Sequence, residues 1–162
     1  MWFFNFLASR GYCSNIPPKL HKRIKKHGEI FFHYRINSYT YTSFNWIHDA
    51  FYKWDNENNK YVKIVPLNIE EFLTPLALAI WFMDDGSKIN KSARIATNCF
   101  SFQEIEFLCD ILFKKYNLKA TPVKAGVNKG HILYIHTKSI HTFVTLIKPF
   151  MIKSLYYKLG NN

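Results

Sequence analysis

Hydrophobic and polar residues follow two different periods along this chain, and these periods separate expected strands from expected helices. Over residues 29–39 an apolar or aromatic residue alternates with a polar one, which is typical of a strand with one solvent-facing side. A basic segment over 17–28 is expected to form a turn or hairpin arm before it. Further short strands are expected at 61–65, 93–97, 119–124 and 131–136. Apolar residues spaced as on a helix predict helices over 3–10, 43–54, 74–86, 101–116 and 138–147.

The helix expected over 74–86 is the most informative segment. Thr74 can cap its first free N–H groups, and Pro75 suits the first helical position. Residues 76–83 are all apolar, which predicts a helix covered by protein on every side. A similar signal marks the start of the helix at 101–116, where Ser101 and Glu104 have the spacing of a capping box.

Two adjacent carboxylates, Asp84 and Asp85, end the first of these helices, and Gly86 follows them. The C-terminal end of a helix carries partial negative charge, so a bound cation would relieve the repulsion there. Gly86 is expected to adopt a backbone conformation that larger residues resist. A buried helix with a solvated exit turn explains this segment equally well.

The charge of the chain indicates a polyanionic partner. Its 162 residues include 22 Lys and Arg against 11 Asp and Glu, a net charge of +11. No acidic residue follows Asp110, whereas nine lysines do. Such a field attracts nucleic acid, although it also promotes solubility. The 48% of hydrophobic residues exclude a disordered basic tail, because they are enough to form a core.

Cysteine, histidine and apolar residues exclude other classes of protein. Cys13, Cys99 and Cys109 lack the spacing of metal ligands, which indicates reduced thiols in an intracellular protein. The seven histidines form no zinc pattern. No apolar run is long enough to span a membrane, and the N-terminal residues do not form a secretion signal.

The segment Leu78-Ala79-Ile80-Trp81-Phe82-Met83-Asp84-Asp85-Gly86 resembles the motif of the LAGLIDADG homing endonucleases, and in particular of their mitochondrial intron-encoded branch. Other segments agree with that branch: 13–19, 44–45, 73–79, 147–149 and 157–159. The resemblance covers nearly the whole chain. It implies an α+β homing-endonuclease fold in a mitochondrial protein, built from αββαββα halves that pack through their motif helices and lay antiparallel sheets over the DNA major groove.

The resemblance also implies roles for individual residues. Asp85 corresponds to the metal-binding carboxylate, and Asp84 is a further metal ligand through its carbonyl. Lys158 and, in a weaker alignment, Lys63 correspond to lysines near the active centre. The cofactor implied is Mg²⁺, which accepts one or two carboxylates with water and phosphate as ligands. The side chains expected to contact double-stranded DNA are Arg35, Lys88, Lys91, Arg94, Lys119, Lys124, Lys129 and Lys153. Strand alternation makes Arg94, Lys119 and Lys124 the best candidates.

The chain departs from the family pattern because it contains only one motif helix. Residues 1–70 are expected to form the C-terminal part of a first half, and residues 71–162 a second half. Ile80 and Trp81 stand where the commonest motif has smaller residues, so Ala77 and Ala79 are expected to allow the close approach of a partner helix. The chain is therefore expected to be a truncated two-motif enzyme, completed by a missing N-terminal half or by a second copy.

Three functions are compatible with these features. The first is a site-specific endonuclease that hydrolyses duplex DNA during intron homing. The second is a maturase that binds group I intron RNA. The third is an inactive remnant that binds nucleic acid. Asp85 beside Lys158 favours the endonuclease, whereas the single motif favours the other two.

Overall fold

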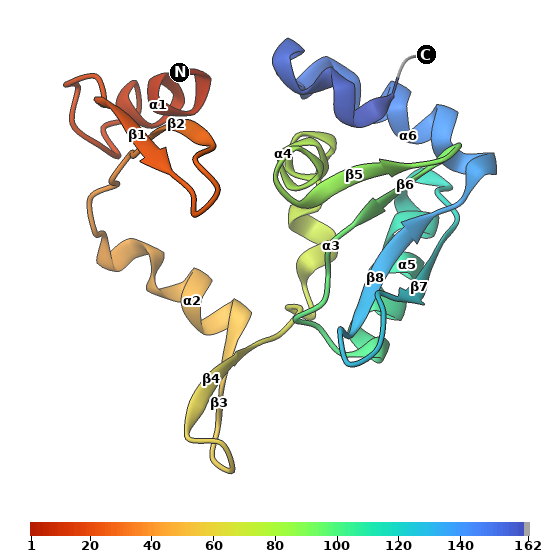
Figure 1. Ribbon diagram of the computed structural model, residues 1–162. Helices are drawn as coiled ribbons and strands as arrows, with labels where there is room; N and C mark the ends of the chain where they lie inside the picture. The colour runs from red at the N-terminus through yellow and green to blue at the C-terminus, as the bar shows by residue number, and fades with distance from the viewer. Residues whose placement is uncertain (161–162) are drawn as a thin grey trace. The chain divides into compact units, whose positions relative to one another are not determined.

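A computed structural model describes residues 1–160 of the chain, which divides into two compact units, Met1–Asn45 and Trp46–Asn162. The first unit contains α1 (Trp2–Ala8), β1 (Leu20–Ile24), β2 (Ile30–Tyr34) and the short 3-10 helix η1 (Thr42–Phe44). β1 and β2 form an antiparallel two-stranded sheet (Figure 1). This hairpin confirms the basic arm expected over 17–28. Only Phe4 and Cys13 are buried among residues 1–45, so this unit has almost no core of its own.

The second unit begins with a helix, a hairpin and a single helical turn. These are α2 (Asn45–Phe51), β3 (Tyr52–Asp55), β4 (Lys60–Lys63) and α3 (Ile69–Phe72). The helix expected over 43–54 ends earlier than its apolar spacing indicated. Residues from Tyr52 onward pair with β4 instead, and the rings of Trp54 and Tyr61 meet across the two strands at a centroid distance of 5.0 Å. Cross-strand aromatic pairs of this kind stabilise a hairpin and here prevail over helical spacing.

The remaining elements form one αββαββα unit. Their order is α4 (Pro75–Asp85), β5 (Gly86–Ile89), β6 (Ser92–Ile95), α5 (Phe102–Tyr116), β7 (Ala120–Lys124), β8 (His131–Ile135) and α6 (Ile140–Ile147). The short 3-10 helices η2 (Thr137–Ser139), η3 (Lys148–Phe150) and η4 (Lys153–Leu159) flank α6. The four strands form one antiparallel sheet in the order β5-β6-β8-β7. β5 was not expected as a separate strand, because a four-residue segment that begins with glycine gives little periodic signal.

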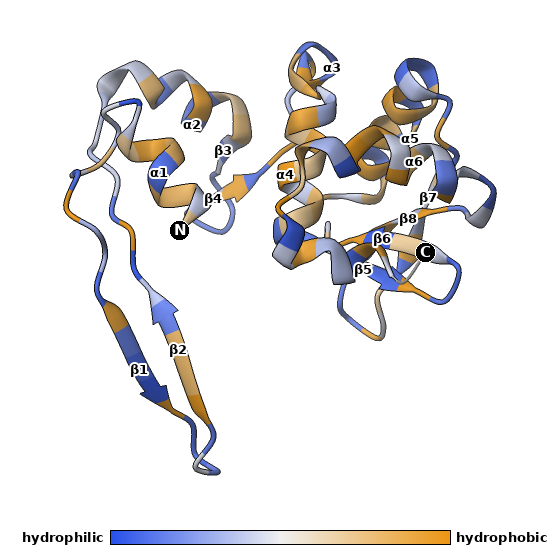
Figure 2. Cartoon of the chain, turned by 90° about the horizontal axis from the view of Figure 1, so that it is seen from above, coloured by the Kyte–Doolittle hydropathy of each residue, from blue (hydrophilic) through white to orange (hydrophobic). Residues whose placement is uncertain are grey.

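The main core lies between one face of this sheet and the helices. Ala93, Ile95, Leu133 and Ile135 point from the strands into that core, where they meet buried residues of α4, α5 and α6. The other face carries residues of the opposite parity and is not covered by α5, which lies behind the sheet in Figure 1. Figure 2 shows that α4, α5 and α6 carry many hydrophobic residues. The open face is therefore available to a partner.

Helix α5 is fixed at its start by the capping box predicted from the sequence. The Ser101 side chain accepts a hydrogen bond from the Glu104 backbone N–H, and the Glu104 carboxylate accepts one from the Ser101 backbone N–H. The same carboxylate accepts a 2.8 Å hydrogen bond from the Val65 backbone N–H. Glu104 thus ties α5 to the segment that leads into α3 and α4.

Helix α4 begins as predicted but is not covered on every side. Thr74 accepts a hydrogen bond from the Ala77 backbone N–H, and Pro75 occupies the first turn. Leu78 and Phe82 are completely buried, whereas Leu76 and Ile80 remain 40% and 39% exposed. One stripe of this apolar helix is therefore free, and the expectation of complete coverage was wrong.

The reason for Gly86 also differs from the prediction. Its φ of −86° and ψ of 152° are open to any residue, so no unusual backbone conformation requires glycine. Instead, a Cβ atom at this position would overlap the ring and the backbone carbonyl of Phe82. Glycine is needed for space, because β5 leaves the end of α4 directly against a buried aromatic ring.

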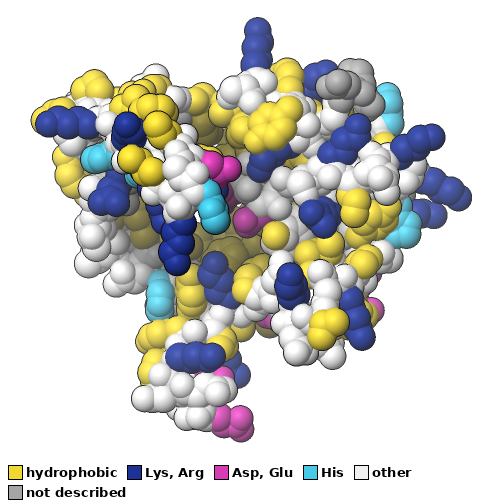
Figure 3. Space-filling model, viewed as in Figure 1, with side chains coloured by type: hydrophobic (Ala, Val, Ile, Leu, Met, Phe, Trp, Pro, Cys, Tyr) yellow, Lys and Arg dark blue, Asp and Glu magenta, His cyan; other side chains and the backbone are white. Residues whose placement is uncertain are grey.

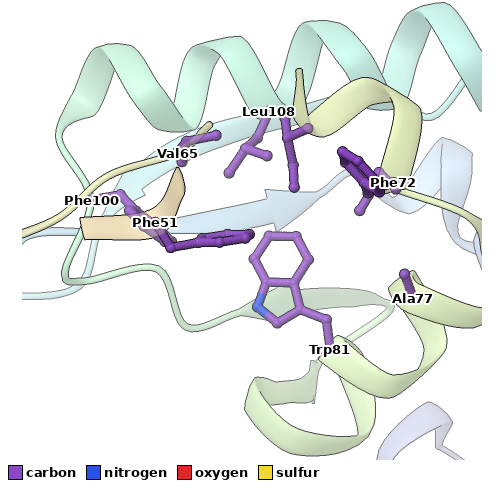
Figure 4. A pocket seen from close by; sticks show the side chains of 9 residues that line it. Phe51, Val65, Phe72, Ala77, Trp81, Phe100 and Leu108 are labelled. Atoms are coloured by element: carbon purple, nitrogen blue, oxygen red, sulfur yellow. The ribbon is translucent and has the colours of Figure 1, made fainter. Parts of the chain in front are cut away.

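An apolar cavity of about 290 Å³ lies beside α4 (Figure 4). Trp81 points from the motif helix toward Phe51 and Phe72 at its wall, and Ala77 lines it as well. Ala79 is completely buried in the core of the same unit. Ala77 and Ala79 therefore face the interior of this unit, and the free stripe of α4 consists of Leu76 and Ile80. The bulky Trp81 fits because the cavity accommodates its ring.

Candidate catalytic carboxylates and nucleic-acid interface

The carboxylates of the motif lie at the end of α4. Asp84 and Asp85 are both exposed, whereas the preceding Met83 is buried. The helix ends at this point because β5 starts at Gly86, and the backbone carbonyl of Asp85 accepts a 3.0 Å hydrogen bond from the Ala96 N–H. The edge of the sheet thus holds the end of the helix and leaves two carboxylates at the surface.

Lys158 reaches the same end of the helix from η4, 73 residues further along the chain than Asp85. Its Nζ atom donates hydrogen bonds to the carbonyls of Met83 at 2.6 Å and of Asp84 at 3.1 Å. These carbonyls belong to the last turn of α4, where a cation is favoured by the helix dipole. The fold therefore brings together Asp84, Asp85 and Lys158, three of the residues selected from the sequence.

The donor set fits part of a divalent metal site. Two exposed carboxylates can hold Mg²⁺ when water and phosphate supply the other ligands. Within residues 1–160, no group of three or more His, Cys, Asp or Glu side chains is positioned to hold a metal ion. The Asp84 carbonyl, expected to contribute to metal binding, accepts a hydrogen bond from the Lys158 ammonium instead.

Lys63 lies at the end of β4, where it pairs with Tyr52 of β3. It is exposed, and in the described part of the chain it makes no hydrogen bond or ion pair with Asp84, Asp85 or Lys158. The structure thus places Lys158 at the carboxylates and leaves Lys63 on a separate hairpin.

A polar row crosses the open face of the four-stranded sheet. The strand register aligns Ser87, Arg94, Tyr134 and Thr121 side by side. Arg94 Nε donates a 3.0 Å hydrogen bond to the Ser87 hydroxyl, and Thr121 Oγ1 lies 3.1 Å from the His136 ring nitrogen Nε2. Arg94 forms no ion pair with any described residue, so its guanidinium keeps donors available for a ligand.

The other cations selected from the sequence surround this sheet. Lys88 lies on β5, Lys91 in the β5–β6 turn, Lys119 just before β7, Lys124 at the end of β7 and Lys129 in the β7–β8 turn. All five are exposed. Figure 3 shows several Lys and Arg side chains at the surface of the part of the chain that holds this sheet. By alternation Lys119 has the same parity as Thr121 on the open face. Lys88 and Lys124 have the parity of the covered face, so the register does not put Lys124 on the open face as expected. Lys88 also packs against Gly160. Lys153 starts η4, and Arg35 follows β2 in the first unit; both are exposed.

Tyr134 was not selected from the sequence, although it lies beside Arg94 on the open face. It is half-buried, as is His136, whose ring nitrogen lies 3.1 Å from the Thr121 hydroxyl. A tyrosine inside an apolar strand suggests a core residue, so the missing information was the register between β6 and β8. The one signal in the sequence was strand alternation over His131–Ile135, which puts Tyr134 on the face opposite to Leu133 and Ile135.

Comparison with known proteins decides the family. The model of the LAGLIDADG DNA endonuclease family matches residues 1–143. This chain belongs to that family. The endonucleases of the LAGLIDADG family are generally dependent on divalent metals. The resemblance and the α+β fold predicted from the sequence are therefore confirmed.

Individual LAGLIDADG relatives match over nearly the whole chain. The cytochrome b mRNA maturase bI2 of Saccharomyces cerevisiae is 37% identical over 161 residues, which cover 99% of this chain and 38% of the maturase. The intron-encoded endonuclease ai4 of Dictyostelium discoideum is also 37% identical, over 97% of this chain and 98% of that protein. The solved structure of the homing endonuclease I-WcaI bound to its DNA recognition sequence superposes with a TM-score of 0.80 and 28% identity, over 99% of this chain and 71% of that one. This chain thus spans well under two thirds of the length of the yeast maturase.

Proposed function

We propose that this LAGLIDADG chain is part of a Mg²⁺-dependent homing endonuclease that hydrolyses phosphodiester bonds in duplex DNA. The observation that supports this most directly is the position of Asp84 and Asp85, which are exposed at the end of the motif helix and held there by Lys158. The open, cation-bordered face of the sheet begins at the same helix end, because β5 follows α4 without a loop. A DNA strand bound to that face would run past the carboxylates.

Each residue has a separate task in this proposal. Asp85, assisted by the Asp84 carboxylate, would hold Mg²⁺, which when bound supplies an activated water and stabilises the leaving oxygen. Lys158 keeps the end of α4 in place through two backbone carbonyls. Its positive charge would lie close to the phosphate that is cut. Arg94 and Lys119 would contact bases or phosphates from the open face. Lys63 has no established place in this arrangement, and a phosphate contact is its proposed role.

The division of the chain into parts of two LAGLIDADG halves belongs to the same proposal, with residues 1–70 in a first half and 71–162 in a second. Two uncovered apolar surfaces support it. One is the stripe of Leu76 and Ile80 on α4, and the other is the hairpin face that carries Ile24, Ile30 and Phe32, all more than half exposed. A second motif helix, from another polypeptide segment or from a second copy, would cover α4 and add the carboxylate that a two-metal site requires.

The decisive experiment measures cleavage of a duplex DNA that spans the site at which the intron inserts. The full protein is incubated with Mg²⁺, or with Ca²⁺ as a non-catalytic control. Asp85→Asn is expected to abolish cleavage in Mg²⁺ while DNA binding persists. Asp110→Asn, which removes an exposed carboxylate from α5, is expected to leave cleavage unchanged. Full activity of Asp85→Asn would remove this residue from the mechanism.

A maturase function is the second candidate, and the 37% identity to the yeast cytochrome b mRNA maturase favours it. In that case the protein would bind intron RNA and accelerate splicing without needing Asp85. A splicing assay with the intron transcript separates the two functions, because Asp85→Asn would retain full splicing activity and lose only DNA cleavage. A mitochondrial location is part of the same proposal, and the similarity to a cytochrome b mRNA maturase supports it. Among residues 1–160 no helix has the length and apolar character needed to cross a bilayer.

A further inference from the structure

The β1–β2 hairpin has two chemically different faces, and one of them combines aromatic rings with cations. The register pairs His21 with His33 and Arg23 with Phe31, so these four side chains share one face. The opposite face carries mainly apolar residues, with Lys22 opposite Phe32. In Figure 2 β1 is hydrophilic between two hydrophobic ends, whereas β2 is hydrophobic over its first three residues. All ten residues of the two strands are exposed.

The rings on the polar face are flat surfaces available to a ligand. The His21 and His33 rings are stacked, with centroids 5.6 Å apart and planes within 25°. Phe31 is 43% exposed, and the Lys25 ammonium lies 4.0 Å from the centre of its ring. We name this surface, made of His21, Arg23, Lys25, Phe31 and His33, the ring face. It offers three aromatic rings beside two cations, Arg23 and Lys25.

A DNA duplex cannot use such rings fully. Its bases are stacked on one another, so a bound protein reaches only their edges and the phosphates. An unpaired base exposes its whole face and can stack on an aromatic side chain, while the phosphate of the same nucleotide contacts a neighbouring Lys or Arg. Lys25 contributes a cation–π contact to Phe31 and an ion pair with Glu29 at 3.6 Å. A base that stacks on the ring would replace the first contact. Arg23, which forms no ion pair in the described part of the chain, would then meet its phosphate.

We propose that the ring face binds unpaired nucleotides, with Phe31 as the main stacking residue. This site is distinct from the open sheet face of residues 86–135 and requires neither Asp84 nor Asp85. Unpaired nucleotides occur both in loops of folded RNA and in separated DNA strands, and the chemistry of stacking is common to the two. The proposal thus goes beyond duplex cleavage and does not depend on it.

Neighbouring phenylalanines provide a matched pair of variants. Phe31 and Phe32 are adjacent, both are exposed, at 43% and 63%, and they lie on opposite faces of the hairpin. Phe31→Leu removes the ring and keeps an apolar side chain, and Phe31→Tyr keeps the ring. Phe32→Leu makes the same change on the apolar face. Circular dichroism of each full-length variant verifies that the fold is retained.

The experiment measures fluorescence anisotropy of three labelled probes: a uridine oligonucleotide of about 12 residues, the matching thymidine oligonucleotide and a duplex of the same length. Phe31→Leu is expected to weaken binding of the single-stranded probes by roughly 5- to 100-fold, whereas Phe31→Tyr and Phe32→Leu stay within about 2-fold of the parent protein. Duplex affinity is expected to change by less than about 2-fold in all three variants.

The two single-stranded probes also identify the source of the ligand. Tighter binding of the uridine probe assigns the ring face to RNA, and tighter binding of the thymidine probe assigns it to a separated DNA strand. Equal losses in Phe31→Leu and Phe32→Leu would overturn the proposal, as would a loss of duplex binding as large as the loss for single strands. Retained DNA cleavage by Phe31→Leu would show that this site and the catalytic carboxylates act separately.

Discussion

Replacement of Lys158 by Met tests whether the lysine holds the motif helix in place. The side chain is partly buried, and its ammonium donates to the carbonyls of Met83 and Asp84. Methionine has a similar length and keeps the packing of the aliphatic stem but offers no donor. The two carbonyls would lose their partner at a helix end that already carries two carboxylates.

The expected loss of stability can be worked out from these contacts. A hydrogen bond to a charged group contributes about 1.5–3 kcal/mol, and a cation at a helix C-terminus contributes about 0.3–1 kcal/mol when exposed. Fixing a lysine side chain costs up to about 2 kcal/mol of conformational entropy, which offsets part of this gain. Two such hydrogen bonds and the charge, less this entropy, give a net loss of about 1–5 kcal/mol in Lys158→Met. For a chain of 162 residues this corresponds to a decrease in Tm of roughly 2–20 °C.

Thermal unfolding followed by circular dichroism measures this loss, and Lys153→Met is the matched control. Lys153 lies five residues earlier in the same 3-10 helix, is exposed and makes no hydrogen bond to any described side chain or carbonyl. Its replacement is expected to change stability by less than about 0.5 kcal/mol. If Lys158→Met and Lys153→Met had the same Tm, the helix-anchoring role of Lys158 would be refuted, and only a direct role at the phosphate would remain.

Three further predictions follow from the fold and the charge. Gly86→Ala is expected to lower stability by about 1–3 kcal/mol in urea unfolding, because the new methyl group overlaps the buried Phe82 ring; an unchanged midpoint would contradict this reason for the glycine. Burial alone would raise the pKa of Glu104, but hydrogen bonds from Ser101 and the Val65 N–H lower it below its ordinary value of 4.5. The ionised Glu104 carboxylate therefore stabilises the folded state above pH 4.5, and this stabilisation is lost as the pH falls below that value. Glu104→Gln is expected to remove that pH dependence and to lower the stability by about 0.5–2 kcal/mol at pH 7. The same loss of stability in acid for Glu104→Gln and the parent protein would contradict this role of Glu104. DNA affinity is expected to fall roughly 10³- to 10⁵-fold between about 50 and 200 mM salt if 6–10 phosphates are contacted, so a flat salt titration would contradict a phosphate-dominated interface.

Local signals in the sequence predicted much of the fold. The cap at Thr74 and the capping box at Ser101 and Glu104 depend on contacts within one turn, and both appear in the structure. The strand expected over 131–136 also appears in the structure, as β8. Such features are encoded in neighbouring residues, so no knowledge of tertiary contacts is needed to find them.

Features that depend on distant residues were harder to predict. The helix expected over 43–54 ends at Phe51 because its last residues pair with β4, and Gly86 is explained only by the position of the Phe82 ring. The contact of Lys158 with the end of α4 was implied by family resemblance alone. No periodicity could reveal it, since it joins residues 75 positions apart for Met83 and 74 for Asp84.

The free stripe on α4 connects the fold to the proposed activity. A helix with Leu76 and Ile80 exposed is poorly suited to remain alone in water, and the same helix ends in the carboxylates that would bind metal. Covering the stripe with a second motif helix would bury apolar surface and would also place a second carboxylate beside Asp85. Assembly and catalysis are then coupled through one element. We therefore expect Ile80→Glu to abolish Mg²⁺-dependent cleavage although the carboxylates are intact, and to leave salt-sensitive DNA binding by the sheet largely unchanged. Cleavage by Ile80→Glu at the parental rate would separate the two properties and refute the proposed packing.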